Sequence, residues 1–446
     1  MKNTIKINFE NTVGKIKPMH SVNNGPVISR GVGNADKFRE IGVPFVRTHD
    51  ASFFSGYGGS HSTDVNYIFP NFDADENDPS SYDFVLTDKY MRDIAEGGSK
   101  VFFRLGSKIE HEIKKYNTYP PKDYLKWAKI CEHIILHYTE GWADGFDAGV
   151  AYWEIWNEPD CANADGTNPC WQGTDEEFYD FFCVAFKHLK SKFPHLKIGG
   201  PAFCSSGSRM ERPFLDRLKK ENIKLDFYSF HAYKEVPRKF MRDTKYVRKL
   251  LDEYGMNETE TVLDEWNYVC GWLGDDWKKT IKAEISIKGA SFLLGTMITC
   301  QNSPLDHLMY YDARPCVMNG LFDFYTLDPL KGFYALKMFG DIYRIENEAE
   351  SSADDGEHLF CVAAAKESEK CASITYFDDD DNAADREINL EISGLSGSES
   401  IVIYLTNEIC TMKEYITASA KAGKTIIPIT LGNYDMIFIK ICKQSQ

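Results

Sequence analysis

The chain of 446 residues lacks several familiar signals, and each absence excludes a class of protein. Lysine and arginine form no cluster, and the formal net charge is −16 at pH 7, so the sequence does not indicate a nucleic-acid partner. No apolar run is long enough to span a bilayer, and residues 1–10 alternate like a strand where a signal peptide would have an apolar core. We therefore expect a cytoplasmic protein without a membrane partner.

Two kinds of cofactor motif are also missing. The chain has 12 cysteines but no Cys-x-x-Cys pair, so neither a zinc site nor a redox motif is indicated, and we expect free, buried thiols. Cys161 and Cys170 flank one loop and could form a disulfide if the protein were exported. No Gly-x-Gly-x-x-Gly follows the first predicted strand, which argues against a dinucleotide-binding open sheet. The sequence predicts no metal and no cofactor.

The strongest signal that is present lies in residues 152–160, which read Tyr-Trp-Glu-Ile-Trp-Asn-Glu-Pro-Asp. A hydrophobic run of strand length ends there at a proline, so Asn157 and Glu158 fall at the carboxyl end of a buried strand. A glutamate that simply faces solvent is the alternative. The neighbouring tryptophans favour a general acid, because desolvation by an aromatic wall raises the pKa of a carboxyl group.

A second carboxylate of the same kind appears 107 residues later, at Glu265. It closes a β-branched and apolar run, residues 261–267, and is followed directly by Trp266. Two carboxylates at strand ends form the pair that glycoside hydrolysis requires, and a separation of about 5–5.5 Å would indicate retention while a wider gap would indicate inversion. By strand alternation, Asp264 should point to the opposite side and have a structural role.

The order of the predicted elements indicates a (β/α)₈ barrel, a TIM barrel, with an accessory all-β sandwich. Each of eight strands is followed by a helix, and every polar motif falls at the carboxyl end of a strand, where barrel enzymes carry their chemistry. A doubly wound open sheet is the rival. The predicted strands are 19–27, 43–50, 100–106, 152–158, 197–203, 225–233, 261–267 and 306–312.

From about residue 350 the pattern changes to short strands separated by turns, which indicates a β-sandwich that recruits the N-terminal strand. We predict three segments: a joining strand at 1–14, a catalytic barrel at 15–345 and the sandwich at 346–446. The acidic run 378–381 reads as a solvated hairpin tip, with a calcium site as the alternative. The long connection 51–85 carries Tyr57 and other aromatics, and we interpret it as a lid over the site.

Further polar and aromatic residues at the strand ends are candidate substrate-binding groups. Asn157 is expected to hold a sugar hydroxyl, with a turn-forming asparagine as its alternative. His231 and Tyr233 alternate to one side of the sixth strand and suit hydrogen bonding to the nucleophile, although His231 could equally be a core histidine bonded to the backbone. The remaining candidates are His49, Asp50, Trp266 and Tyr311.

The motifs Trp156-Asn157-Glu158-Pro159 and Asp264-Glu265-Trp266-Asn267 resemble a clan of retaining glycosidases whose catalytic carboxylates end the fourth and seventh barrel strands. Together with Arg47-Thr48-His49 and Ser229-Phe230-His231-Ala232-Tyr233, they resemble glycoside hydrolase family 39, which includes β-xylosidases and α-L-iduronidases. This resemblance, over about residues 15–345, implies that Glu158 is the acid/base, Glu265 the nucleophile, and Asn157, His231 and Tyr233 their supporting groups.

The sugar itself stays open, because the loops at His49-Asp50, Arg104 and Arg314 depart from the xylosidase pattern. Arabinose-containing or other plant glycans are alternatives, and either arginine could bind a uronate or form an ion pair at the barrel rim. A non-catalytic sugar-binding barrel would lack one carboxylate, and a metallohydrolase would need histidine pairs at the strand ends. We expect an oligosaccharide as the partner, and the oligomeric state, a homo-oligomer included, is open.

Overall fold

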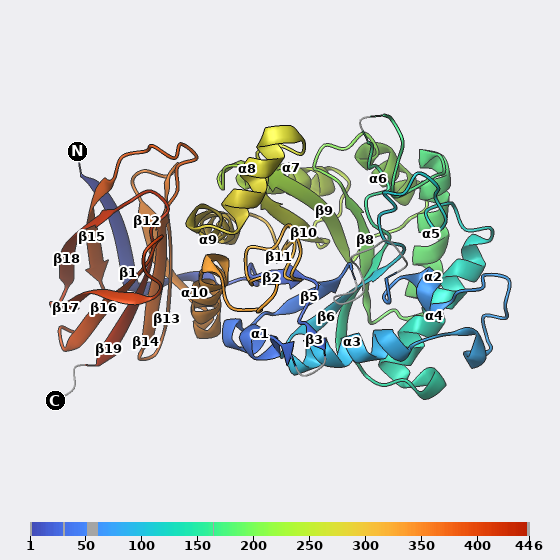
Figure 1. Ribbon diagram of the computed structural model, residues 1–446, viewed down its shortest axis with the longest axis horizontal. Helices are drawn as coiled ribbons and strands as arrows, with labels where there is room; N and C mark the ends of the chain where they lie inside the picture. The colour runs from blue at the N-terminus through green and yellow to red at the C-terminus, as the bar shows by residue number, and fades with distance from the viewer. Residues whose placement is uncertain (1, 30–31, 51–60, 164, 444–446) are drawn as a thin grey trace.

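The protein consists of a closed barrel and a separate sheet that lie side by side, the barrel on the right of Figure 1 and the sheet on the left. The computed structural model describes residues 2–29, 32–50, 61–163 and 165–443. The fold prediction, a (β/α)₈ barrel with an accessory all-β unit, is confirmed.

The barrel contains eight parallel strands in chain order, and its first and last strands pair, Ser21 with Met309. This closure makes the open-sheet alternative wrong. The fourth strand carries the Asn157-Glu158 motif beyond its end, and Glu265 lies in the seventh. The strands are β2 (Ser21–Asn23), β5 (Phe45–Thr48), β6 (Lys100–Leu105), β7 (Val150–Ile155), β8 (Lys197–Phe203), β9 (Phe227–Lys234), β10 (Glu260–Tyr268) and β11 (His307–Tyr310).

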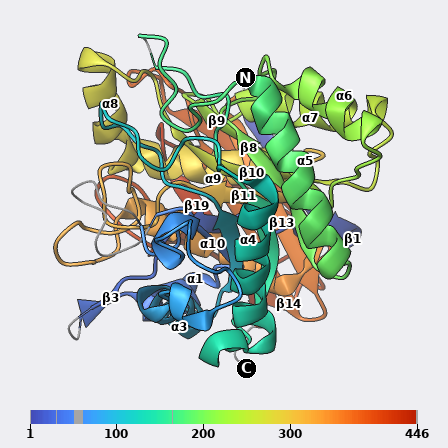
Figure 2. The same ribbon diagram turned by 90° about the vertical axis from the view of Figure 1, so that its right-hand side faces the viewer.

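Helices cover the outside of the barrel, and α4 and α5 run side by side in Figure 2. The helix α5 begins at a capping box, in which Thr174 and Glu177 each bond the other's backbone N–H. Two helices follow the seventh strand, because Ser286 caps the second of them by accepting the N–H of Lys288. The helices are α1 (Ala35–Ile41), α2 (Val65–Ile68), α3 (Val85–Glu96), α4 (Tyr124–Glu140), α5 (Asp175–Lys192), α6 (Glu211–Lys220), α7 (Lys239–Glu253), α8 (Gly274–Glu284), α9 (Ile287–Gln301) and α10 (Lys331–Ile345).

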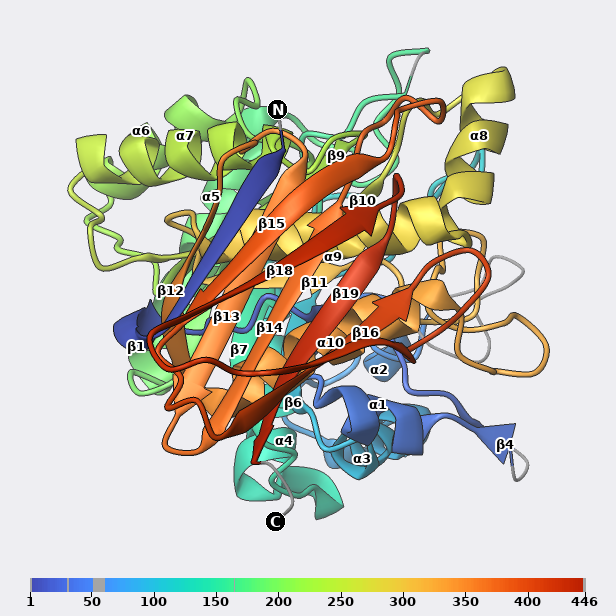
Figure 3. The same ribbon diagram turned by 90° about the vertical axis from the view of Figure 1, so that its left-hand side faces the viewer.

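The accessory unit is a nine-stranded sheet that includes the N-terminal strand β1, between β12 and β15 (Figure 3). Ile403 and Ile427, from strands near opposite ends of the sheet, share one buried cluster, so the sheet curls over a core of its own. Two of its strands, β12 and β17, are rich in polar residues and lack the apolar alternation typical of a strand. The strands are β1 (Asn3–Lys15), β12 (Asn347–Ala353), β13 (Leu359–Lys366), β14 (Glu369–Tyr376), β15 (Arg386–Ser393), β16 (Glu399–Thr406), β17 (Lys413–Ser419), β18 (Lys424–Leu431) and β19 (Met436–Lys443).

The long connection after β5 is only partly described, since residues 51–60, including Tyr57, lie outside the described residues. Its remainder holds α2 and a short 3-10 helix at Pro79–Ser81. Phe69 is buried in the barrel core, so this part of the connection packs against the barrel side. The prediction of a lid over the site is not tested by these residues.

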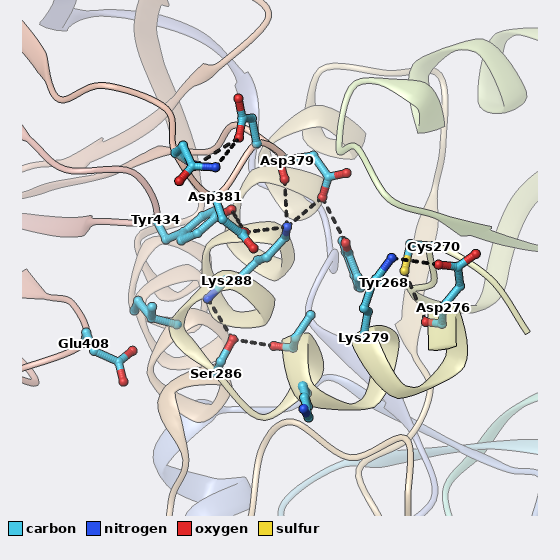
Figure 4. Close-up of a pocket in the computed structure, with 15 residues that line it drawn as sticks. Tyr268, Cys270, Asp276, Lys279, Ser286, Lys288, Asp379, Asp381, Glu408 and Tyr434 are labelled. Atoms are coloured by element: carbon cyan, nitrogen blue, oxygen red, sulfur yellow. Dashed lines mark hydrogen bonds and ion pairs between the residues drawn. The ribbon is translucent and has the colours of Figure 1, made fainter. Parts of the chain in front are cut away.

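The barrel and the sheet are joined at the acidic loop that follows β14. Lys288, from α9, places its ammonium group 3.0 Å from a carboxylate oxygen of Asp379 and 2.8 Å from one of Asp381 (Figure 4). The rings of Tyr268 and Tyr434 lie 5.6 and 5.5 Å from the same nitrogen. Asp380 and Asp381 are exposed to solvent, as predicted for this acidic run. The prediction of a hairpin tip is wrong, because the loop connects β14 to β15 and these strands do not pair.

We expect Lys288→Met to lower the free energy of unfolding by about 1–3 kcal/mol, since it removes hydrogen bonds to charged groups and leaves two carboxylates facing each other. Thermal unfolding of wild type and variant measures this loss. The control is Lys278→Met, which removes an exposed ion pair with Asp275 and should have almost no effect. Equal losses in the two variants would mean that Lys288 does not join the units.

Candidate active site

Glu158 lies at the barrel mouth on a backbone that turns sharply after β7. Its φ is +47°, a left-handed conformation that costs energy for a glutamate and is typical of functional sites. The N–H of Glu158 donates to the carbonyl of Ala202 at 2.9 Å, which ties the turn to β8. The side chain is only 8% exposed, and its Oε1 lies 2.7 Å from Nδ1 of His231.

Glu265 enters the same space from β10 through an irregularity in strand pairing. Against β9, Leu263 pairs with Phe230 and Glu265 with His231, so Asp264 is an extra residue, a β-bulge. Arg47 contacts Asp264 at 3.1 Å and Glu265 at 3.4 Å, so both carboxyl groups face the barrel interior. The expectation that Asp264 points away from Glu265 is wrong, because the bulge breaks the alternation.

The two glutamates and His231 form a compact group. One ligand atom of each of Glu158, His231 and Glu265 lies within 4.8 Å of the others. The three atoms could hold a metal ion, but the 2.7 Å contact between His231 and Glu158 accounts for their closeness by hydrogen bonding alone. The sequence-predicted pair of carboxylates is thus brought together across the barrel mouth.

Burial raises the pKa of both glutamates, but to different values. The pKa of Glu158 is raised to about 8, first by its burial and then by the nearby Cys161 and Asp160. Burial and the Glu158 carboxylate raise the pKa of Glu265 to about 7, and His231, Arg47 and the Tyr233 hydroxyl oppose that rise. Over the interval between these values Glu265 is ionised while Glu158 keeps its proton.

Arg47 organises the polar interior beneath this pair, and sequence analysis did not single it out as a site residue. Its fully buried guanidinium lies 2.7 Å from Glu154 and donates to the Asn157 side-chain oxygen at 2.7 Å. Three carboxyl groups therefore share one guanidinium, and burial together with Glu154 raises the pKa of Asp264 well above its usual range. A charged residue inside the apolar run of β5 was the available signal.

Of the two residues expected to bond the nucleophile, Tyr233 contacts Glu265, whereas His231 lies closer to Glu158, at 2.7 Å, than to Glu265, at 3.6 Å. Asn157 accepts from Arg47 with its oxygen, while its Nδ2 has no hydrogen-bond partner among the described residues and is available to a ligand. Tyr233 donates its hydroxyl to Oε1 of Glu265 at 2.5 Å. His231 contacts Glu158, not the backbone, which makes its reading as a core histidine bonded to the backbone wrong.

A cavity of about 490 Å³ opens beside the pair, and His49, Asp50 and Tyr311 lie in its wall as the sequence predicted. His49 Nε2 is 4.0 Å from Glu265, which joins the cavity to the carboxylate pair. Asp50 accepts from the Tyr311 hydroxyl at 3.0 Å and from Arg314 at 2.8 Å. The cavity is therefore lined by a fixed polar network.

Trp266 does not belong to this site. It is fully buried and packs against Phe240, Phe292 and Tyr310 on the helix side of the barrel. Because Glu265 faces inward, alternation turns the next side chain outward. The prediction that Trp266 binds substrate is wrong.

Arg104 and Arg314 are ion-paired at the rim. Arg104 lies 2.8 Å from Asp64 and donates to the carbonyl of His49 at 2.6 Å. Arg314 pairs with Asp50 and with Asp312, the latter at 2.9 Å. Among the described cavity residues the remaining cation, Lys108, pairs with Glu112, so the wall holds matched charges.

The loops around the mouth also carry exposed aromatic side chains, which sequence analysis did not single out. Within the described barrel residues these are Tyr116, Tyr119, Trp272, Phe324 and Tyr325, all on loops that follow β6, β10 or β11. Trp272 is 53% exposed and packs edge-on against Tyr233, with ring centroids 4.9 Å apart. An aromatic face thus lies next to the tyrosine that bonds Glu265.

Cys161 and Cys170 are free thiols in this structure, and they lie close to the site. Of the described helices, none has the length and apolar character needed to cross a membrane.

Comparison with known proteins agrees with this geometry. The family model "Glycosyl hydrolases family 39" matches residues 59–280, which contain both glutamates. A β-xylosidase from Geobacillus stearothermophilus is 31% identical over 180 residues, which cover 40% of this chain and 31% of that protein, so the matched region spans about a third of the relative. A β-xylosidase from Caldicellulosiruptor saccharolyticus is 26% identical over 203 residues, 44% of this chain and 37% of that one.

Two solved structures share the fold over the whole chain. A glucosidase from Croceicoccus marinus has a TM-score of 0.79 at 21% identity, with both chains covered completely. A monomeric β-xylosidase from Caulobacter crescentus has a TM-score of 0.74 at 14% identity, covering 99% of this chain and 100% of that one. The matched family model and the related sequences place residues 59–280 of this chain in glycosyl hydrolase family 39, and the solved structures share its fold.

Proposed function

We propose that the protein is a retaining glycosidase of the β-xylosidase type, with Glu158 as acid/base and Glu265 as nucleophile. The observation that carries the proposal is the buried pair of carboxylates with oxygens within 4.8 Å of each other. Retaining enzymes have carboxyl groups about 5–5.5 Å apart, whereas inverting enzymes need about 6.5–9.5 Å to admit a water molecule. The short separation supports double displacement.

In the first step the Glu265 carboxylate attacks the anomeric carbon, and the bond to the leaving oxygen breaks as Glu158 gives that oxygen its proton. The product is a glycosyl ester of Glu265. In the second step Glu158, now ionised, removes a proton from water, whose oxygen displaces Glu265 and releases the sugar. Glu158 ends the cycle protonated, in keeping with its higher pKa.

The neighbouring groups support these roles. His231 holds Glu158 by one carboxylate oxygen and so orients its proton towards the leaving group. Tyr233 and Arg47 stabilise the ionised form of Glu265 by hydrogen bonding and charge. The free Nδ2 of Asn157 is placed to donate to a sugar hydroxyl next to the reacting carbon.

The cavity favours a neutral sugar, because its arginine and lysine charges are matched by carboxylates. Binding of a uronate would leave a negative charge in excess, so an iduronidase activity is not supported. Two relatives are named β-xylosidases and one structural neighbour a glucosidase, and xylose or glucose would suit such a cavity. A glycan containing arabinose stays the alternative.

The activity should follow a bell-shaped pH profile. Below about pH 7 the nucleophile Glu265 takes up a proton, and above about pH 8 the acid Glu158 loses one, so kcat/KM should be greatest between these values. Tyr233→Phe removes a hydrogen bond to ionised Glu265, raises its pKa and should shift the acid limb to higher pH. Tyr311→Phe, which loses hydroxyl bonds to Asp50 and Arg314 and none to Glu265, is the control; an equal shift there would contradict the assignment.

Trp272 should provide a stacking surface for the part of the substrate beyond the cleaved bond. We expect Trp272→Ala to reduce kcat/KM by about 3–10-fold on a tetrasaccharide, which corresponds to the free energy of one lost aromatic contact. The loss on a methyl glycoside, which has no such part, should be much smaller. Tyr415→Ala, an exposed tyrosine of the accessory sheet, should change neither rate. Equal losses on both substrates would indicate damage to Tyr233 and not lost stacking.

The function is tested with nitrophenyl glycosides, measured with wild type and Glu265→Ala side by side. The panel contains the β-xyloside, β-glucoside, β-galactoside, α- and β-arabinosides and α-iduronide. We expect turnover of the β-xyloside or β-glucoside by wild type only, and retention of configuration in the first product by NMR. An inverted product would overturn double displacement, and binding of sugars without any turnover would favour a sugar-binding barrel.

A further inference from the structure

Three thiols surround the outer side of Glu158, and the proposed reaction uses none of them. Cys161 lies in the turn after β7 and donates its backbone N–H to the carbonyl of Glu158 at 3.1 Å. Cys204 follows β8, and its backbone N–H donates to Asp160 at 2.9 Å. Cys170 returns from the far end of the same loop and is buried, while Cys161 and Cys204 are partly exposed.

The side chains converge more closely than their positions in the sequence suggest. One carboxylate oxygen of Glu158 and the sulfur atoms of Cys161 and Cys204 all lie within 4.8 Å of one another. The thiol of Cys161 also interacts with that of Cys170. Two partly exposed thiols and a largely buried carboxylate thus lie close enough together to bind one ion.

We propose that Cys161, Cys204 and Glu158 form a binding site for a soft divalent cation of the Zn²⁺ class, and that its occupation blocks catalysis. Thiolates select Zn²⁺ and Cd²⁺ over Mg²⁺ and Ca²⁺, which prefer oxygen ligands. Two sulfurs and one carboxylate oxygen supply three of four tetrahedral ligands, and Cys170 or water completes the set. The sulfur and oxygen atoms must move together by a few tenths of an ångström to about 1 Å for a compact tetrahedron.

The position of Glu158 explains why the cation would inhibit. The carboxylate belongs to both clusters, one with His231 and Glu265 and the other with the two thiols. A cation bound to it would prevent Glu158 from carrying the proton to the leaving oxygen. This inhibitory consequence rests on the proposed function, whereas the metal site itself does not.

The test uses the full-length protein kept reduced with a phosphine, so that no disulfide competes with the metal. Cadmium chloride is titrated and the ultraviolet charge-transfer absorption of cadmium thiolate is recorded; zinc chloride is titrated against turnover of the best nitrophenyl glycoside. We expect one equivalent of Cd²⁺ to bind, Zn²⁺ to inhibit turnover, and EDTA to restore activity. Mg²⁺ and Ca²⁺ should neither bind at the thiols nor inhibit.

Cys161→Ser and Cys204→Ser should each weaken Cd²⁺ binding by about tenfold or more, and Zn²⁺ inhibition with it. Cys442→Ser, a partly exposed thiol of the accessory sheet, should bind Cd²⁺ as wild type does. The absorption band does not depend on turnover, so it tests the site even if the enzyme assay fails. No band with wild type, or an undiminished band in Cys161→Ser and Cys204→Ser, would overturn the site; a normal band with unaffected turnover would overturn its link to Glu158.

Discussion

Replacing Glu265 by alanine should reduce kcat by about 10⁴-fold or more, because the reaction loses the group that forms the covalent intermediate. The fold should persist, because three carboxyl groups share the Arg47 guanidinium and two of them, Glu154 and Asp264, remain to pair with it. Turnover of an aryl glycoside and the thermal unfolding midpoint measure the two effects. Activity that survives in Glu265→Ala would mean that another residue is the nucleophile.

Azide separates the roles of the two glutamates by the configuration of its product. In Glu265→Ala, azide takes the place of the nucleophile and displaces the leaving group once, so the glycosyl azide has inverted configuration. In Glu158→Ala, azide attacks the glycosyl ester of Glu265, and two displacements give net retention. Glu158→Ala should also lose most activity on substrates with poor leaving groups. Equal loss on good and poor leaving groups, with no azide product, would contradict its role as acid/base.

Arg47→Met should lower the free energy of unfolding by about 3–5 kcal/mol, since it leaves the buried carboxylates without their cation. The side chain is completely buried and contacts Glu154, Asp264 and Glu265. Denaturant unfolding of both proteins measures the loss. Arg212→Met is the matched control, because its ion pair with Glu253 is largely exposed and its loss should change the stability little.

The loss caused by Arg47→Met should shrink as the pH falls. Burial raises the pKa of Glu154, but the Arg47 charge and hydrogen bonds with Asp264, Ser229 and Arg47 together lower it below its usual value. In wild type this carboxylate therefore stabilises the fold above its unfolded pKa and ceases to do so at acid pH. Arg47→Met lacks this contribution, so its free energy of unfolding should fall less than that of wild type as the pH is lowered. A difference between the proteins that stays constant from neutral to acid pH would show that packing of the arginine side chain, and not its charge, is responsible.

Much of the architecture could be predicted from the sequence because the barrel repeats one local rule. Each strand is a short apolar run that ends in polar residues, and closing the sheet brings Glu158 and Glu265 together without further information. The start of α5 is also set by a local pattern, since its capping box is formed by Thr174 and Glu177 within one turn. The catalytic roles of Glu158 and Glu265 stay predictions.

What sequence analysis missed depends on pairing between distant segments. The bulge at Asp264 arises from the register of β10 against β9, which no local pattern encodes. The role of Arg47 requires three carboxyl groups from β7 and β10. The clustered thiols come from two different loops. Trp266 is a different case, because alternation from the inward-facing Glu265 was enough to place it in the core.

The position of β1 has a consequence for synthesis on the ribosome. This strand pairs with β15, Asn3 opposite Ile388, and with β12, Ile5 opposite Ala353. At about 5–20 residues per second, the ribosome needs roughly 20–80 s to make the residues between Asn3 and Ile388. For most of that interval, until β12 (Asn347–Ala353) is made, Ile5, Ile7 and Phe9, all buried in the finished sheet, have neither partner strand beside them. The nascent chain therefore carries an uncovered apolar strand while its barrel forms, and is a natural client for a chaperone at that stage.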